Sequence, residues 1–187
     1  VTPSNAAICL FVNPLPNVIL DSVIFIIIHF SPHFIKSQEK KLKNILKLMI
    51  ILNYETEFKL KNKNKIIKWL SRVILSEKKK EGDINYIFCD DEYLVEINQQ
   101  YLNHNTLTDI ISFDYSVGNE LHGDIFISID RVKENAVDFN VSLDEELKRV
   151  MVHGVLHYCG YQDKSESDEL LMRSKEDEKI KMFHVEQ

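Results

Sequence analysis

Two histidines four residues apart, His153 and His157, stand in a segment whose pattern predicts a helix. Residues at this spacing lie on the same helix face, so both imidazoles can bind one ion. Gly160 follows as a natural helix terminator, and Asp163 comes three residues later. The resulting H-G-x-x-H-x-x-G-x-x-D pattern has the spacing of H-E-x-x-H-x-x-G-x-x-H metal sites. It predicts three ligands and one open coordination position, as in catalytic zinc sites.

Two residues depart from the metalloprotease pattern. Gly154 stands where those enzymes carry the glutamate that acts as general base, which disfavours ordinary peptide hydrolysis. A small residue at this position is also expected to leave room for a bulky substrate beside the helix. Asp163 replaces the third histidine, and a carboxylate binds zinc well. The alternative role for Asp163 is to cap the following helix, a position that Ser165 fills equally well.

Composition and charge limit the classes of function. With 187 residues, of which 44% are hydrophobic, the chain forms one domain, with or without an extension. Three scattered cysteines without a C-x-x-C pair favour a reducing, cytoplasmic setting. The net charge of −6 argues against a nonspecific nucleic-acid binder. Between Lys59 and Lys80, however, nine basic residues accompany one glutamate, which indicates either a solvated helix face or a phosphate contact.

The first 48 residues differ from the rest. Their uninterrupted apolar run, Val23 to Ile28, is far shorter than the roughly 20 residues that a membrane span needs. The basic residues follow this run instead of preceding it, which does not fit a signal peptide. Met49 begins a plausible first strand. We therefore interpret residues 1–48 as a spurious or disordered N-terminal extension and residues 49–187 as the functional domain. That domain contains 18 basic and 27 acidic residues, a formal net charge of −9.

The elements that must position the metal ligands follow from periodicity and turn signals. Strands are predicted at residues 50–58, 85–89, 110–115 and 125–129, and helices at 64–76, 90–103, 131–139, 142–159 and 165–182. Gly82 is expected to break the pattern before the second strand. Ser142 and Glu145 form a capping box for the histidine helix. The short connection at 116–120 predicts an antiparallel hairpin. Strands cluster early and helices late, which favours an α+β fold with a small mixed β-sheet and helices on one side.

Three further segments precede the histidine motif. They are Asn98-Gln99-Gln100-Tyr101, then Thr108 to Phe113 (T-D-I-I-S-F), then Gly123 to Ser128 (G-D-I-F-I-S). Each is weak alone, since Asp109 can be a turn residue and Phe113 a core residue. In this order, and followed by His153 to Asp163, they make residues 49–187 resemble the YbeY family, bacterial rRNA maturation factors described as metal-dependent endoribonucleases.

The resemblance implies an α+β metalloprotein with one zinc ion per chain. The implied metal ligands, which also act in catalysis, are His153, His157 and Asp163. The implied activity is single-strand-specific RNA cleavage in rRNA processing, including maturation of the 16S rRNA 3′ end, and in ribosome quality control. The implied setting is the cytoplasm. The implied partners are rRNA in the small ribosomal subunit, ribosomal proteins and a ribosome-assembly GTPase.

Two departures from the family pattern bear on activity. The family's third histidine is Asp163 here, and the arginine that commonly follows N-x-x-Y is Leu102, which cannot bind phosphate. His104 and the Lys59–Lys80 segment are the candidates for that role. Besides a metal-dependent endoribonuclease, two alternatives remain. One is a ribosome-assembly binding factor with a mainly structural metal, which the acidic charge and Leu102 favour. The other is a metal-dependent hydrolase of another substrate, such as a peptide, which Gly154 disfavours.

Overall fold

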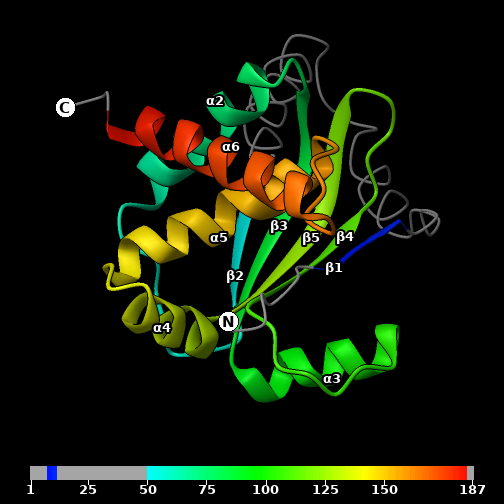
Figure 1. Cartoon of the computed structure of the whole chain (residues 1–187), viewed down its shortest axis with the longest axis vertical. Helices are drawn as coiled ribbons and strands as arrows, with labels where there is room; N and C mark the ends of the chain where they lie inside the picture. Colours follow the sequence, from blue (N-terminus) through cyan, green and yellow to red (C-terminus); the bar gives the residue numbers. More distant parts are fainter. Residues whose placement is uncertain (1–7, 12–49, 185–187) are drawn as a thin grey trace, which may run out of the picture. The chain divides into compact units, whose positions relative to one another are not determined.

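The computed structural model describes residues 8–11 and 50–184 (Figure 1). Its strands are β1 (Ile8–Phe11), β2 (Ile50–Tyr54), β3 (Lys80–Cys89), β4 (Ile110–Asp114) and β5 (Glu120–Ser128). Its helices are α2 (Lys63–Ser76), α3 (Asp91–Leu102), α4 (Ile129–Asp138), α5 (Leu143–Tyr158) and α6 (Glu166–His184). The described residues belong to one compact unit. A second unit, residues 13–49, and most of the predicted extension lie outside the described residues.

The strands form one mixed sheet in the order β1-β4-β5-β3-β2. Strands β4 and β5 pair antiparallel, as the predicted hairpin requires, and the other neighbours pair parallel. The α+β class with a small mixed sheet is therefore confirmed. Strand β3 begins at Lys80, earlier than predicted, because it pairs with β5 from Lys80 onward. Gly82 does not end the element: it lies inside β3, where a Cβ atom would be only 2.5 Å from the ring of His122.

Helices cover both faces of the sheet, so the expectation of helices on one side was wrong. Successive residues of a strand point to opposite faces. Ile110 of β4 belongs to the main core with α5, whereas Ile111 and Phe113 of the same strand pack with Leu94 of α3. Every residue of β4 is buried, as expected for a strand that is covered on both faces.

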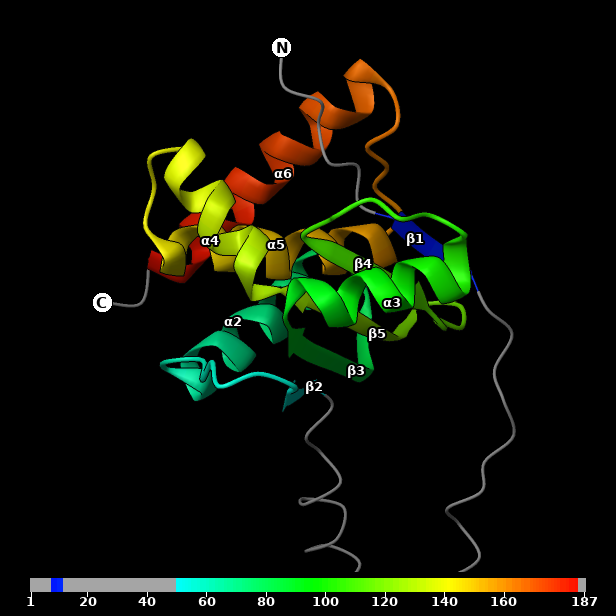
Figure 2. The same ribbon diagram turned by 90° about the horizontal axis from the view of Figure 1, so that it is seen from below.

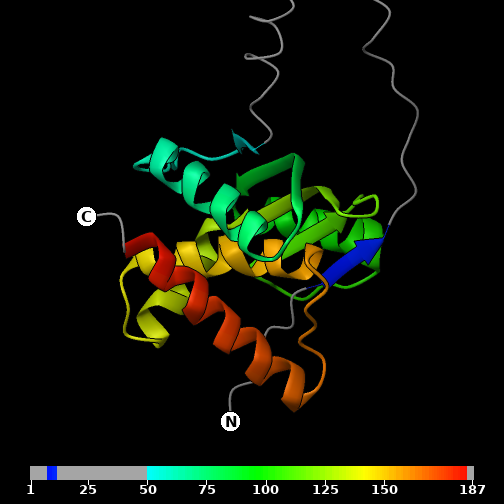
Figure 3. The ribbon, with the colours of Figure 1, turned by 90° about the horizontal axis from the view of Figure 1, so that it is seen from above.

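Helix α5 lies between the sheet and α6 (Figures 2 and 3). Gly154 makes this close packing possible. A Cβ atom there would lie 3.0 Å from the Cδ1 atoms of Ile110 and Ile125, so a larger side chain would push α5 off the sheet. The expectation that Gly154 leaves room for a substrate was therefore wrong. The glycine faces the core, and a glutamate at this position has no space.

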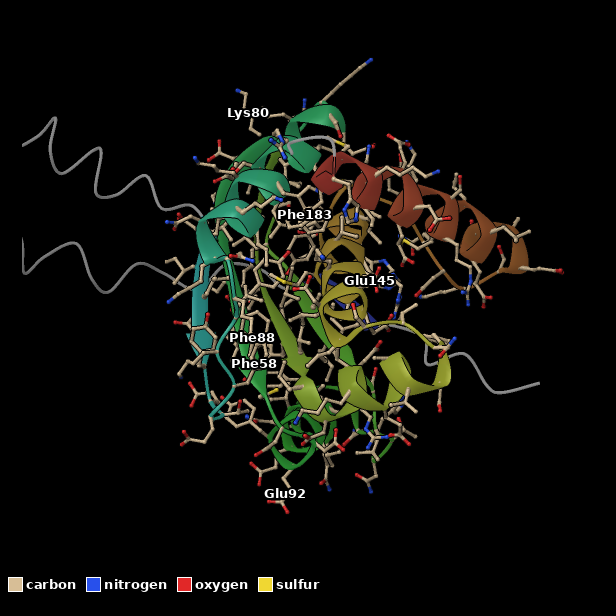
Figure 4. All side chains as sticks on the ribbon, turned by 90° about the vertical axis from the view of Figure 1, so that its left-hand side faces the viewer. Phe58, Lys80, Phe88, Glu92, Glu145 and Phe183 are labelled. Atoms are coloured by element: carbon tan, nitrogen blue, oxygen red, sulfur yellow. The ribbon has the colours of Figure 1, made fainter. Side chains whose placement is uncertain are left out.

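Aromatic contacts join α2 to α6. The rings of Trp69 and Phe183 meet edge to face with centroids 5.5 Å apart, and Trp69 Nε1 donates a hydrogen bond to the Lys179 carbonyl oxygen at 2.8 Å. Figure 4 shows Phe183 between α2, α5 and α6, and Phe58 beside Phe88 at the sheet. Within residues 8–11 and 50–184, no helix is both long enough and apolar enough to cross a membrane.

Candidate metal centre

Helix α5 brings the two predicted histidine ligands together. It begins with the predicted capping box, in which Ser142 Oγ accepts from the Glu145 amide and Glu145 Oε2 accepts from the Ser142 amide. Because His153 and His157 are one turn apart, their Nε2 atoms lie 3.0 Å from each other. Both residues are buried, with 8% and 4% of their surfaces exposed.

Asp163 reaches the same point through the turn that ends α5. Gly160 has a φ of 103°, a left-handed conformation that glycine adopts without strain, and it redirects the chain. Asp163 Oδ2 then lies 3.5 Å from the Nε2 atoms of both histidines. Ser165 takes the capping role that was the alternative for Asp163, because its Oγ accepts from the Asp168 amide at 3.2 Å.

The outer nitrogen of each histidine has an acceptor of its own. His153 Nδ1 lies 2.6 Å from Glu176 Oε1, and His157 Nδ1 lies 2.9 Å from the Tyr161 carbonyl oxygen. A carbonyl oxygen accepts hydrogen bonds and does not donate them, and an ionised carboxylate does the same. The Nδ1 atoms therefore carry the protons, and in the neutral rings both Nε2 lone pairs face Asp163. This is the usual support of metal-bound histidines.

The spacing of the three inner atoms fits a small cation. A tetrahedral ion with bonds of about 2.0–2.1 Å keeps its ligand atoms about 3.3 Å apart. The three separations here are 3.0, 3.5 and 3.5 Å. Two imidazole nitrogens and one carboxylate oxygen also form a donor set that zinc commonly takes. Among the described residues, these three form the group of ligand atoms close enough to share one metal ion.

The same convergence changes the acidities of the ligands. Burial lowers the pKa of His153, but its hydrogen bonds with Asp163 and Glu176 outweigh burial and raise the pKa to about 9. Burial raises the pKa of Asp163, but hydrogen bonds from both histidines outweigh burial and hold that pKa well below its usual range. A metal ion must therefore displace a proton from the ligands at neutral pH, so metal affinity is expected to fall as pH falls.

A buried ionic network extends the support of His153. Arg149 Nε and Nη2 donate to the two carboxylate oxygens of Glu146 at 2.9 and 2.6 Å. Its Nη1 and Nη2 atoms also lie 3.5 Å from Glu176 Oε1 and Asp109 Oδ2, respectively. Burial raises the pKa of Asp109, and the nearby Arg149 opposes that rise. Asp109, whose sequence context left it as a possible turn residue, thus joins the network behind the metal ligands.

The sequence analysis did not predict the acceptors of the two histidine Nδ1 atoms, which are Glu176 and the Tyr161 carbonyl oxygen. Glu176 carried one signal, because the buried residues of α6 share a stripe of helical spacing that includes a carboxylate: Met172, Glu176, Lys179 and Phe183. Charged residues seldom lie in such a stripe without a partner.

The G-D-I segment positions α5. A Cβ atom at Gly123 would lie 2.3 Å from both the Phe113 carbonyl oxygen and the Tyr158 hydroxyl oxygen. That hydroxyl donates to the carbonyl oxygens of Phe113 and Asp124, at 2.9 and 3.1 Å. Gly123 therefore makes the space through which the end of α5 binds the β4–β5 hairpin.

Most of the candidates for phosphate contact are exposed. His104 is in the exposed connection between α3 and β4, and the described structure does not include the side chain of Leu102. Lys59 and Lys63 place their Nζ atoms 4.5 and 5.8 Å from the centre of the Tyr54 ring.

Comparisons with known proteins match most of this chain. The family model described as Endoribonuclease YbeY matches residues 50–184. The Endoribonuclease YbeY of Flavobacterium psychrophilum is 71% identical over 139 residues, which cover 74% of this chain and 99% of that protein. The protein of the same name from Christiangramia forsetii is 57% identical over 133 residues, or 71% of this chain and 93% of that one.

A solved structure shares the fold. The solution structure of TM1509 from Thermotoga maritima is similar with a TM-score of 0.53 and 26% identity, over 73% of this chain and 90% of that one. Together with the matched family model and the relatives' identities, this shows that the chain belongs to the YbeY endoribonuclease family.

Proposed function

We propose that this protein is a zinc-dependent endoribonuclease that cleaves single-stranded RNA. The observation that carries the proposal is the meeting of His153 Nε2, His157 Nε2 and Asp163 Oδ2 in a domain of the endoribonuclease YbeY family. Its proposed tasks are rRNA processing, including maturation of the 16S rRNA 3′ end, and ribosome quality control. We place it in the cytoplasm, with rRNA of the small ribosomal subunit, ribosomal proteins and a ribosome-assembly GTPase as partners.

Each residue of the site has a defined part in this proposal. His153, His157 and Asp163 hold one zinc ion, which when bound supplies Lewis acidity toward a phosphoryl oxygen or a water molecule. Glu176 and the Tyr161 carbonyl fix the imidazole rings by accepting from Nδ1. Asp163 gives the site one more negative charge than the third histidine of the family pattern does. That charge makes bound water less acidic and favours harder metals.

RNA offers two nucleophiles, and the products tell them apart. Attack by water can leave a 5′-phosphate and a 3′-hydroxyl, whereas attack by the neighbouring 2′-hydroxyl leaves a cyclic phosphate. Analysis of the ends produced by the purified protein distinguishes the two routes.

The test measures zinc content and cleavage of a short RNA that contains the 16S 3′ end. It compares the full chain with His157→Ala and with the control His184→Ala, which alters an exposed histidine at the end of α6. We expect one zinc per chain and cleavage in the wild type and the control. In His157→Ala we expect both to be lost, with cleavage reduced roughly 100-fold or more. Zinc without cleavage above the His157→Ala background would contradict the nuclease proposal.

That last outcome would favour a second candidate, a ribosome-assembly binding factor with a mainly structural metal. The net charge of −9 in residues 49–187 and the leucine at position 102 support it. It predicts that Asp163→Asn still binds pre-ribosomal particles in a sedimentation assay, provided that the variant folds. The nuclease proposal predicts that the same variant loses cleavage.

A further inference from the structure

One residue joins the metal centre to a distant helix. The carbonyl oxygen of Tyr161 accepts from His157 Nδ1 at 2.9 Å, and its hydroxyl donates to Glu77 Oε2 at 2.8 Å. Glu77 is the C-terminal cap residue of α2 and lies 84 positions from Tyr161 in the sequence. Asp163 follows Tyr161 by two residues. The position of Tyr161 therefore influences both the ring of His157 and the third ligand.

Glu77 is itself held in place from α6. Only 12% of its side chain is exposed, and its Oε1 atom contacts Lys179 Nζ and lies 3.3 Å from Lys175 Nζ. Lys179 is 1% exposed and also donates to Ser76 Oγ at 2.9 Å. The buried Lys179 ammonium group is paired with two carboxylates, Glu77 and Glu178, the latter at 2.6 Å, and through these ion pairs α6 holds Glu77 in place.

The ring of Tyr161 is held on its face as well as at its hydroxyl. Lys175 Nζ lies 5.4 Å from the centre of the ring, within the range of a cation–π contact. With the hydroxyl bound to Glu77, the ring has contacts that fix both its direction and its tilt. The backbone that carries the ring is fixed with it.

The acceptor of His157 is a backbone carbonyl, so no side chain can supply or remove it. Its direction depends on the conformation of the turn after Gly160, where glycine gives the chain freedom. The amides of Gly160 and Tyr161 tie the turn to α5 through the carbonyl oxygens of His157 and Leu156, at 2.9 and 3.1 Å, and the Tyr161 side chain adds an anchor outside the turn.

We propose that Tyr161 and Glu77 are positioning residues of the metal centre: their hydrogen bond sets the turn that directs His157 and places Asp163. This inference rests on the proposed metal-binding function. The competing explanation is that the bond merely ties the turn to α2, which would affect stability and leave the metal ligands unchanged.

The experiment uses the full chain with Tyr161→Phe, Glu77→Ala, which removes the acceptor of the Tyr161 hydroxyl, and the double variant. The matched control is Tyr86→Phe. It also removes a buried hydroxyl that binds α5, because Tyr86 donates to the Met151 carbonyl oxygen at 2.9 Å. Three quantities are measured: zinc affinity by competition with a chromophoric chelator, the visible spectrum of the Co²⁺-loaded protein, and the Tm of the metal-free protein.

We expect Tyr161→Phe to lower zinc affinity about tenfold and to change the Co²⁺ spectrum, as loss of outer support around metal ligands does. Tyr86→Phe is expected to lower the Tm and to leave zinc affinity within about twofold of the wild type. The double variant should lose no more affinity than the more affected single variant, because both changes break the same hydrogen bond.

Zinc affinities of Tyr161→Phe within about twofold of the wild type would overturn the inference, as would additive losses in the double variant. Such results, with zinc bound normally by the wild type, leave the proposed function intact. Wild-type protein that takes up no zinc would instead contradict the proposed function, and this inference with it.

Discussion

His153 and His157 lie on the same face of one helix, yet their outer nitrogens are held in different ways. His153 Nδ1 is bound by Glu176 Oε1, and Arg149 Nη1 lies 3.5 Å from the same oxygen. His157 is bound by a neutral backbone carbonyl. The charged partner contributes to the raised pKa of His153, about 9. A substitution can therefore delete the acceptor of His153, whereas it can only displace the backbone acceptor of His157.

The largest effect is expected from Glu176→Gln. The amide oxygen can still accept from His153, so the variant removes the charge and little else. We expect metal affinity to fall about 10–100-fold, and the pKa of His153 to fall as well. Chelator competition measures the affinity, and NMR titration of the imidazole measures the pKa. Asp177→Asn, an exposed neighbour on the same helix, serves as the control. Equal affinities for the two variants would show that the charge on Glu176 is unimportant.

A smaller effect is expected from Arg149→Lys, which keeps the charge and removes the fork on Glu146. Its control is Arg131→Lys. Arg131 binds the Asp91 carboxylate through Nε and Nη2 at 2.9–3.1 Å, on another part of the molecule. Both variants should lose about 1–3 kcal/mol in urea unfolding. Only Arg149→Lys should weaken metal binding, and by less than Glu176→Gln does. Matching metal affinities for both variants would exclude Arg149 from the support of His153.

The smallest expected effect is on the pH dependence of stability, when Glu77, the hydrogen-bond acceptor of Tyr161, is replaced. Burial raises the pKa of Glu77, but Lys179 and Tyr161 outweigh burial, so its pKa in the folded protein is lowered from 4.5. At pH values above the unfolded-state pKa of Glu77, the lowered pKa stabilises the fold. This stabilisation is lost as the pH falls through the folded-state pKa. We therefore expect the metal-free protein to lose stability below about pH 5, less steeply in Glu77→Gln. Urea midpoints between pH 7 and 3 measure this, and identical slopes would contradict it.

The sequence predicted the local features of the site well. The capping box, the histidine pair and the Gly160 turn each depend on residues within a few positions of one another, and the structure contains all three. The hairpin and the α+β class followed from turn signals and periodicity in the same way. These features are set by backbone geometry that short segments encode.

The remaining features depend on packing between distant segments. Glu176 reaches His153 across 23 positions and Glu77 reaches Tyr161 across 84, so no short pattern could pair them. The placement of α3 on the second face of the sheet is a different case. Strand β4 has apolar residues on both faces, Ile110 on one and Ile111 and Phe113 on the other, which was the available signal. The expectation that Gly154 leaves room for a substrate was wrong because the sequence does not show which face of the helix packs against the sheet.

The three candidate ligands, His153, His157 and Asp163, are unequal in one further respect. Two belong to a buried helix that is pinned to the sheet, and the third belongs to the turn that begins at Gly160. Loops open on shorter timescales than packed helices unfold. The rate at which an ion is exchanged should therefore be governed by how often Asp163 swings away, while the equilibrium affinity is governed by all three ligands. Changes to the turn should therefore shorten the residence time of the ion as well as lower its affinity.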